Sequence, residues 1–350
     1  MTFSLGIALA ERGLVPDAVV RFGIRRLALE RLRSLPPLNG EALNSYCQEF
    51  LKSMRQSPIA VLTEKANEQH YELPPEFFEW VLGPQRKYSC CFYPSENATL
   101  SEAEEAALLQ TAEHALLEDG QEILELGCGW GSLSLWMARR YPKSRILGVS
   151  NSQCQRHSIL ERAQKEGLSN LEIETADMNS FSTPRTFDRV VSVEMFEHMR
   201  NWESLLNRVS DWLTPDGRFM MHVFTQAQAP YLFEVADESD WMSQYFFSGG
   251  MMPSLNLAKQ IDCHLEVEAD WVWSGEHYRK TSEHWLENMD RHKEMIMPIL
   301  ASTYGAEAQS IWWHRWRLFF LACAEIFGFQ GGKAWPVGHY RFRKRLEFGR

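Results

Sequence analysis

The chain has 350 residues, of which 45% are hydrophobic, so it can form one large domain or two ordinary ones around a substantial core. Its net charge of −10 argues against a nucleic-acid-binding protein, because such proteins need basic surfaces that face phosphates. The one basic cluster alternates like the outer face of a terminal strand, and we interpret it as a solvated edge: Arg341, Arg343, Lys344 and Arg345. We therefore expect no nucleic-acid partner.

The cysteines and the apolar runs indicate the compartment. The seven cysteines show neither a C-x-x-C pair nor a regular spacing, which is typical of reduced thiols. No apolar run approaches the ~18 residues that a helix needs to cross a bilayer, and the N-terminus lacks the leading basic region of a signal peptide. The sequence thus predicts a cytoplasmic protein without stable membrane insertion.

Residues 1–66 form a predicted helical N-terminal extension. Apolar residues recur with helical spacing between Val19 and Leu32, and again between Tyr46 and Met54, on either side of the Pro36-Pro37 break. An apolar stripe on a helix most often packs against other elements. We therefore expect a structural or oligomeric role, such as a homodimer interface.

Residues 67–120 are predicted to contain a lid. Polar and aromatic side chains, among them His70 and Tyr71, gather around a Pro-Pro break, which favours a loop over a ligand, with a packed connector as the alternative. A helix is expected at 101–117, where Ser101 is a candidate N-cap and Glu104 has capping-box spacing.

From 121 to 230 the chain alternates between strand and helix. The predicted strands are 122–126, 145–149, 171–175, 188–193 and 218–224, and the predicted helices lie near 130–140, 153–166 and 201–213. This order predicts an α/β fold with a doubly wound, mostly parallel sheet that is covered on both faces. Ligands of such sheets bind outside the carboxyl ends of the strands.

Residues 231–350 are predicted to form a substrate cap and the last two strands of the sheet. Strands are expected at 264–273 and 335–346, and helices at 281–292 and 307–327. Most of the many aromatic residues here are expected in the core, because Trp316, Phe319, Phe320 and Cys323 fall on one helical face. A minority of the rings would line a substrate pocket.

The stretch EILELGCGWG at 122–131 is the opening of a nucleotide-binding unit, because a buried strand runs through a glycine loop into a helix. A dinucleotide fingerprint needs its third glycine where Ser132 stands. The spacing here is E-x-G-x-G-x-G, the form that S-adenosylmethionine (SAM) enzymes use. Glu125 would orient the loop or meet the cationic end of the ligand.

Three ionisable residues follow the fourth predicted strand: Glu194, Glu197 and His198. If the chain becomes helical there, they share one face. An amine must lose its proton before it attacks the methyl group of SAM, so His198 would take that proton, with Glu197 orienting the imidazole ring and Glu194 holding the ammonium. We expect no metal, since His198 and His222 lack the spacing of a metal site.

Four motifs occur in order along the chain: LELGCGWGSLSLWMA, GVSNSQCQ, SVEMFEHM and HYRKTSEHW. Together they resemble the cyclopropane fatty acid synthase superfamily of SAM-dependent methyltransferases, and most of all its coclaurine N-methyltransferase branch, which methylates amines in benzylisoquinoline alkaloids. The resemblance covers roughly residue 60 to the C-terminus. It implies a class I, Rossmann-like methyltransferase with SAM as cofactor and a small aromatic or cyclic amine as substrate.

The resemblance also implies roles for individual residues. Tyr88 and Ser89 would meet the SAM carboxylate, and Gly127 and Gly129 would lie along the methionine part. The remaining implied contacts are those of Ser150 and Gln155 with the ribose hydroxyls, Asp177 with the adenine amino group and Met178 with the adenine ring. Glu194, Glu197 and His198 match the catalytic group of the N-methyltransferases.

The lipid-cyclopropanating branch is the alternative that the resemblance leaves open. Its members hold a bicarbonate base with equivalents of Cys90, Glu197, His222 and Tyr278, and all four residue types are present here. That branch carries a small residue at the position of Glu194. A carboxylate there suits an ammonium better than an acyl chain, because a buried unpaired charge is costly. We therefore favour amine methylation.

Overall fold

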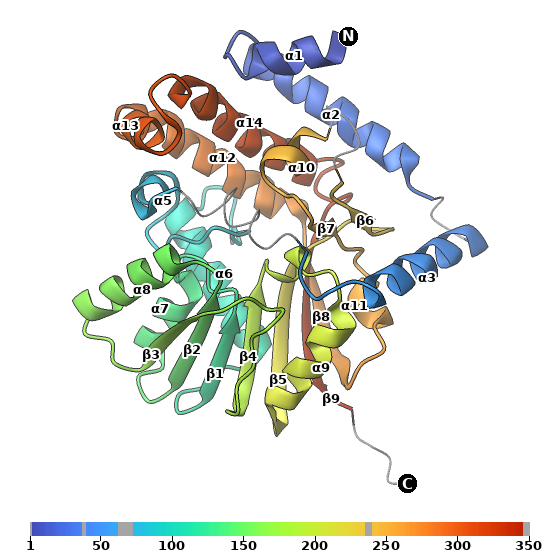
Figure 1. The fold of residues 1–350 in the computed structure, drawn as a ribbon, viewed down its shortest axis with the longest axis vertical. Helices are drawn as coiled ribbons and strands as arrows, with labels where there is room; N and C mark the ends of the chain where they lie inside the picture. Colours follow the sequence, from blue (N-terminus) through green and yellow to red (C-terminus); the bar gives the residue numbers. More distant parts are fainter. Residues whose placement is uncertain (1, 37–39, 62–72, 235–239, 346–350) are drawn as a thin grey trace.

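The computed structural model describes residues 2–36, 40–61, 73–234 and 240–345. Its centre is a seven-stranded sheet with the order β3-β2-β1-β4-β5-β9-β8 (Figure 1). The first five strands in this order are parallel, whereas β9 runs antiparallel to both of its neighbours. The strands are β1 (Glu122–Leu126), β2 (Arg145–Ser150), β3 (Leu171–Thr175), β4 (Phe187–Val193), β5 (Leu213–Phe224), β8 (Leu265–Trp273) and β9 (Val337–Lys344). The predicted α/β fold with a mostly parallel sheet is confirmed.

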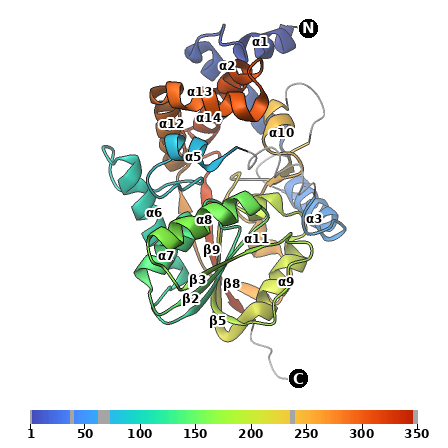
Figure 2. The same cartoon turned by 60° about the vertical axis from the view of Figure 1, so that its left-hand side comes forward.

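Helices cover both faces of the sheet, because neighbouring strand residues point to opposite sides (Figure 2). Ile123 packs into one layer with α6, α7 and α8, whereas Leu124 packs into the other layer with α3 and α9. These helices are α3 (Glu41–Arg55), α6 (Leu100–Ala115), α7 (Ser132–Arg140), α8 (Gln153–Lys165) and α9 (Trp202–Trp212). Apolar runs buried on both sides are what a parallel sheet requires.

The start of α6 differs from the prediction. Thr99, not Ser101, is the N-cap, and it forms a capping box with Glu102. Glu104 is fully buried and accepts hydrogen bonds from the backbone N–H groups of Gln85 (2.8 Å) and Lys87 (3.0 Å). Its carboxylate therefore anchors the segment that leads into the site.

An aromatic cap lies above the carboxyl edge of the sheet. It consists of α5 (Pro75–Val81), α12 (Gly275–Arg291), α13 (Lys293–Tyr304) and α14 (Gln309–Phe327). Trp316, Phe319, Phe320 and Cys323 are all buried in it, as predicted. The sequence did not indicate α13, which contains Pro298, and α12 begins earlier than predicted because Ser274 accepts a hydrogen bond from the Glu276 N–H. Of the predicted lid, residues 67–72 lie outside the described residues.

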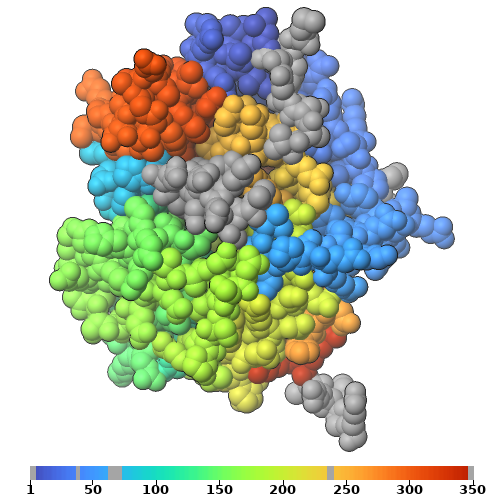
Figure 3. Space-filling model, viewed as in Figure 1, coloured from blue at the N-terminus to red at the C-terminus, as the bar shows by residue number. Residues whose placement is uncertain are grey.

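The N-terminal helices α1 (Thr2–Ala10) and α2 (Asp17–Ser34) lie against this cap (Figure 3). Arg21 of α2 bonds Glu283 at 2.6 Å and Glu325 at 2.9 Å. The predicted apolar stripe of α2 packs against the cap only in part: the side chains of Val19 and Phe22 stay 57% and 65% exposed.

The basic cluster near the C-terminus does not lie on an edge strand, although Arg343 and Arg345 are exposed to solvent. Its first three residues lie on β9, which is enclosed between β5 and β8, and Arg345 follows that strand. Arg341 contacts Glu268 and Arg343 contacts Glu266, both at 2.7 Å, across to β8. These cross-strand carboxylates neutralise the arginines, so the ion pairs of the cluster stabilise the pairing of β9 with β8.

Candidate active site

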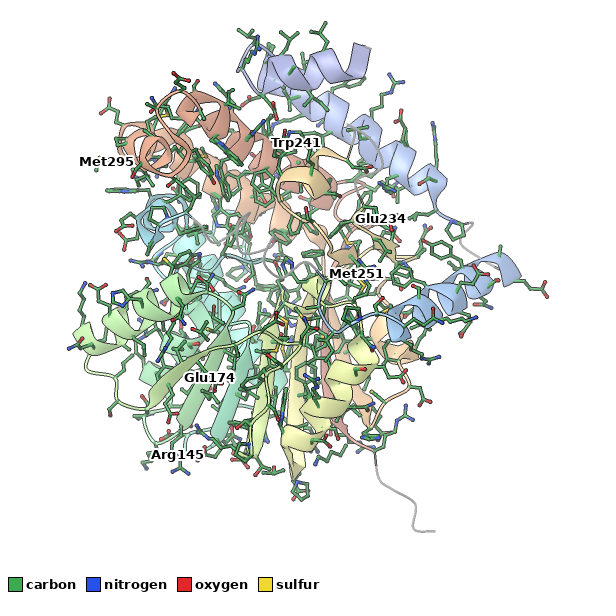
Figure 4. All side chains as sticks on the ribbon, viewed as in Figure 1. Arg145, Glu174, Glu234, Trp241, Met251 and Met295 are labelled. Carbon is green, nitrogen blue, oxygen red and sulfur yellow. The ribbon has the colours of Figure 1, made fainter. Side chains whose placement is uncertain are left out.

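A pocket opens at the carboxyl ends of the parallel strands, the edge at which the sequence predicted a ligand. Met251 of β7 (Met251–Met252), which pairs with β6 (Tyr231–Leu232), lies near this edge, and Arg145 at the start of β2 lies at the opposite one (Figure 4). The residues that line the pocket are Val61, Gly127, Gly129, Val149, Ser150, Asn151, Gln155, Ala176, Asp177, Met178, Glu194, Met195, His198, Met199 and Ser248. Six of the eight predicted cofactor residues are among them.

The glycine loop shapes one wall of the pocket. Gly129 has φ 50°, and a Cβ there would point into open space, so the backbone is exposed to a ligand. Gly131 caps α7 with φ 78°, and a Cβ there would lie 2.6 Å from Ile159 Cγ1. Glu125 does not line the pocket in the part of the chain described. It accepts a hydrogen bond from Ser134 of α7, and it therefore orients the loop and helix.

The polar groups of the opposite wall fit the nucleoside part of SAM. Ser150 Oγ donates a hydrogen bond to Gln155 Oε1 at 2.6 Å, while Gln155 Nε2 is buried and has no partner among the described residues. A ligand hydroxyl would satisfy this amide, since buried donors are rarely left unpaired. The Asp177 carboxylate holds the Asn179 N–H at 2.7 Å, and Met178 is buried beside it. The polar groups of the pocket therefore fit SAM, the cofactor that the sequence predicts.

Tyr88 and Ser89, the other two predicted cofactor residues, are not among the described residues that line the pocket. Tyr88 packs between Phe78 and Trp285, at ring distances of 5.2 and 5.6 Å. Ser89 is buried and bonds the Lys87 ammonium. Their contact with the SAM carboxylate stays a prediction.

Glu194 is held at the turn after β4 by three other elements. Its Oε1 accepts the Cys90 N–H at 2.8 Å and lies 3.1 Å from His222 Nε2, and its Oε2 accepts the Tyr278 hydroxyl at 2.7 Å. Its φ of 50° is a strained value of the kind that clusters at functional sites. Burial raises the pKa of Glu194, and the Lys87 charge and the hydrogen bonds from Cys90 and Tyr278 oppose that rise.

The predicted substrate residues Cys90, His222 and Tyr278 thus converge on one carboxylate. None of the three lines the described pocket. Burial and the Glu194 charge raise the pKa of the Cys90 thiol, which is therefore neutral. Burial likewise lowers the pKa of His222 well below its usual value.

The predicted helical face of Glu194, Glu197 and His198 is wrong. Only a short 3-10 turn, η1 (Phe196–His198), follows the strand, and Glu194 precedes it in a left-handed conformation. Glu197 turns into the protein, where its Oε1 accepts the Phe224 N–H at 2.7 Å. Burial, together with the charge of Glu194, raises its pKa well above the usual range.

His198 lines the pocket beside Glu194 and stacks on Phe247 with ring centroids 6.1 Å apart. Burial lowers the pKa of His198 to about 4, and the Glu194 charge partly opposes this shift. The imidazole is therefore neutral at pH 7 and can accept a proton.

Lys87 is a site residue that sequence reasoning missed. It is only 3% exposed, and its ammonium donates to Ser89 Oγ and to the Cys90 carbonyl at 2.8 Å. Its charge favours the ionised form of Glu194. Nothing in its local sequence distinguishes it from a surface lysine, because its burial depends on elements far along the chain.

Comparisons with known proteins identify the family of the chain. The model of the mycolic acid cyclopropane synthetase family matches residues 61–333. The chain belongs to this family. It is 35% identical over 340 residues to (S)-coclaurine N-methyltransferase of Thalictrum flavum subsp. glaucum, which covers 96% of this chain and 94% of that protein. It is 29% identical over 272 residues to cyclopropane-fatty-acyl-phospholipid synthase of Escherichia coli K12, which covers 77% and 66% of the two chains.

A comparison with solved structures shows that the fold is shared as well. A crystal structure of coclaurine N-methyltransferase bound to N-methylheliamine and S-adenosylhomocysteine superposes with a TM-score of 0.95 and 33% identity. It covers 98% of this chain and 100% of that one. The protein is thus a SAM-dependent methyltransferase, as predicted. Within the described residues, every helix is too short or too polar to cross a membrane.

Proposed function

We propose that this methyltransferase transfers the methyl group of SAM to the nitrogen of a small aromatic or cyclic amine. The observation that supports this most is the carboxylate of Glu194, which lies at the wall of the cofactor pocket and is held there by contacts with Cys90, His222 and Tyr278. A fixed carboxylate binds an ammonium or a developing cation. The relatives named as coclaurine and pavine N-methyltransferases support an alkaloid-like amine as the substrate class.

When bound, SAM supplies a methyl group on a sulfonium, which needs positioning and no further activation. The protein then has to hold the amine and remove its proton. Glu194 holds the ammonium, and the neutral His198 beside it takes the proton, so that the nitrogen lone pair is free to form the N–C bond. The electron pair of the broken S–C bond stays on sulfur.

The same carboxylate argues against the cyclopropanating alternative. Three of the four residues that the resemblance assigns to a bicarbonate base contact Glu194 instead: Cys90 through its backbone N–H, and His222 and Tyr278 through their side chains. The fourth, Glu197, accepts the Phe224 N–H. A second anion beside this buried carboxylate would be strongly repelled. Amine methylation needs no such anion.

A methyl-transfer screen tests the proposal. The protein is incubated with SAM carrying a radiolabelled methyl group and with tetrahydroisoquinolines, phenethylamines or vesicles of unsaturated phospholipid. Label in the amine products alone is the expected result. Label in the lipid alone, with the amines unmodified, would overturn it. Binding of S-adenosylhomocysteine, measured as thermal stabilisation, verifies that the preparation is competent.

A further inference from the structure

The N-terminal helices contact the region around the candidate active site through a single turn of helix, α10 (Trp241–Tyr245). This helix lies beside α2 and α14, as Figures 1 and 2 show. Trp241, which is labelled in Figure 4, and Tyr245 are four residues apart, so both rings lie on one face of α10. Such a short helix is unstable in isolation. The position of α10 therefore depends on the groups that hold these two rings.

The carboxylate of Glu11 and the guanidinium of Arg315 hold both rings. Glu11 follows α1, and its Oε1 accepts hydrogen bonds from Trp241 Nε1 at 2.8 Å and from Arg315 Nε at 2.9 Å. Arg315 of α14 also donates to the Tyr245 hydroxyl at 3.1 Å, and its guanidinium lies 4.1 Å from the centroid of that ring. The side chains of Glu11 and Arg315 are only 15% and 17% exposed. Solvent and salt therefore screen this ion pair less than a surface pair.

The residues that follow α10 enter the candidate active site. Phe247 stacks on His198 with ring centroids 6.1 Å apart, and Ser248 lines the cofactor pocket together with His198. The Gly249 carbonyl then accepts a hydrogen bond from Arg200, two residues after His198, at 3.0 Å. The wall that Phe247 and Ser248 form is thus fixed at one end by Arg200, and at the other end it is joined to α10.

Other ion pairs already attach the N-terminal helices to the cap. Arg21 of α2 donates to Glu283 of α12 at 2.6 and 2.7 Å. Asp17 of α2 accepts hydrogen bonds from Arg317 of α14 at 2.9 and 3.1 Å. These pairs reach the long helices α12 and α14. The Glu11 contact differs from them, because it also reaches the short helix that leads directly into the pocket wall.

We propose that Glu11 is a positioning residue for the amine site and that, through α10, it fixes Phe247 and Ser248 beside His198. The inference rests on the proposed function, because it assigns the His198 side of the pocket to the amine. Glu11 is not among the described residues that line the pocket, so it acts through α10. The N-terminal extension then takes part in substrate binding in addition to its packing on the cap.

The proposal implies an effect on the amine and not on the cofactor. The cofactor wall is built at the ends of the strands, where Gly127 follows β1, Ser150 ends β2 and Asp177 follows β3. Loss of the Glu11 contact releases α10 and with it Phe247, whereas the strand ends keep their places. Affinity for the amine should therefore fall while affinity for the cofactor is retained.

The test uses the full chain, SAM and a tetrahydroisoquinoline that the parent methylates. Glu11→Ala should lower kcat/KM for the amine about fivefold or more, because a hydrogen bond to a charged group is worth roughly tenfold or more in an equilibrium constant. The Kd of S-adenosylhomocysteine, measured by calorimetry, should stay within about twofold of the parent. Backbone hydrogen exchange of residues 241–248, followed by mass spectrometry, should become faster in this variant.

Glu283→Ala is the matched control, because it removes one carboxylate from another ion pair between the N-terminal helices and the cap. Its effect on urea unfolding should be similar to that of Glu11→Ala. Its kcat/KM for the amine and its exchange at residues 241–248 should stay within about twofold of the parent. A purely structural role of Glu11 would instead give both variants the same kinetics.

Trp241→Phe supplies an independent test, which stays valid if Glu11→Ala does not fold. It keeps an aromatic ring but removes the N–H that Glu11 accepts, so kcat/KM for the amine should fall about threefold. In the double variant the two effects should be less than additive, because both substitutions break one contact.

Three results would each overturn the positioning role while amine methylation stands. They are parental kcat/KM for the amine in Glu11→Ala and Trp241→Phe, an equal loss in Glu283→Ala, and a loss of S-adenosylhomocysteine affinity as large as the loss in kcat/KM. A parent that methylates no amine would overturn the proposed function and this inference with it.

Discussion

Replacing Glu194 with Gln isolates the contribution of its negative charge. Gln has the same shape, and its amide can satisfy the three neighbours of the carboxylate. The amide oxygen can accept the N–H of Cys90 and face His222, as Oε1 does now, while the amide NH2 can donate to the hydroxyl oxygen of Tyr278. The site geometry should therefore survive, and only the charge that faces the amine is lost.

The magnitude follows from electrostatics. Two unit charges 4 Å apart attract each other by about 4 kcal/mol at an effective dielectric constant of about 20. Desolvation of the amine offsets part of this, so we expect a loss of ~3 kcal/mol, or about 100-fold in kcat/KM for the amine. The free energy of unfolding should not fall, because Gln removes a buried charge and keeps the bonds.

The assay is steady-state methyl transfer at saturating SAM with one tetrahydroisoquinoline, together with urea unfolding. Glu125→Gln is the matched control, because it makes the same exchange at a buried carboxylate one strand away that orients the glycine loop and not the amine, so any effect should fall on the KM for SAM and be removed at saturating SAM. Its kcat/KM for the amine should change by less than about threefold. If Glu194→Gln also kept kcat/KM within threefold, the carboxylate would have no part in holding the ammonium.

Three further outcomes are expected. His198→Ala should lower kcat far more than SAM affinity, and raising the pH should partly restore kcat because the amine, with a pKa of roughly 10.4, then loses its proton to solvent; equal kcat in variant and parent would remove His198 from its role. Burial raises the pKa of Glu125 to about 7 from 4.5, so the neutral Glu125 carboxyl gives its full contribution to stability below pH 4.5, and this contribution, up to ~3 kcal/mol, is lost as the pH rises through 7. Urea titrations should therefore show Glu125→Gln gaining stability relative to the parent over this range, and parallel pH profiles would contradict this. Gly131→Ala should destabilise the protein by about 1–3 kcal/mol, because a Cβ at φ 78° meets Ile159 at 2.6 Å; an unchanged urea midpoint would refute this reason.

The sheet and the cofactor pocket were predictable because both follow from local pattern. Short apolar runs separated by helical periodicity define parallel strands, and the carboxyl ends of such strands share one edge. Gly127, Ser150, Asp177 and Glu194 each follow or end a different strand, so their meeting in one pocket follows from topology alone. The prediction of this pocket did not depend on any specific contact between distant segments of the chain.

The start of α6 shows where local pattern becomes ambiguous. Thr99-x-x-Glu102 and Ser101-x-x-Glu104 both have capping-box spacing. The fold selects the first, because the Glu104 carboxylate is needed by the backbone N–H groups of residues 85 and 87. A contact between distant segments therefore determines which residue caps α6, whereas the local sequence allows both.

The sequence indicated the position of the candidate site in the sheet but not the directions of its side chains. A helical reading placed Glu194, Glu197 and His198 on one face, whereas the backbone turns sharply at Glu194 and directs its carboxylate towards Cys90, His222 and Tyr278. A left-handed residue after a strand leaves no trace in hydrophobic periodicity, because it changes the direction of one side chain only.

That single turn connects the cofactor pocket to the interior of the sheet. On one side, the Glu194 carboxylate borders the pocket beside His198. On the other side, its Oε1 faces His222, and His222 pairs with His339 of the neighbouring strand β9. A residue in the extended conformation would have continued β4 and kept its side chain within one layer. We interpret the strained conformation of Glu194 as functional, because it places the carboxylate at the pocket wall, where it can hold a cation, while three neighbouring residues fix its position.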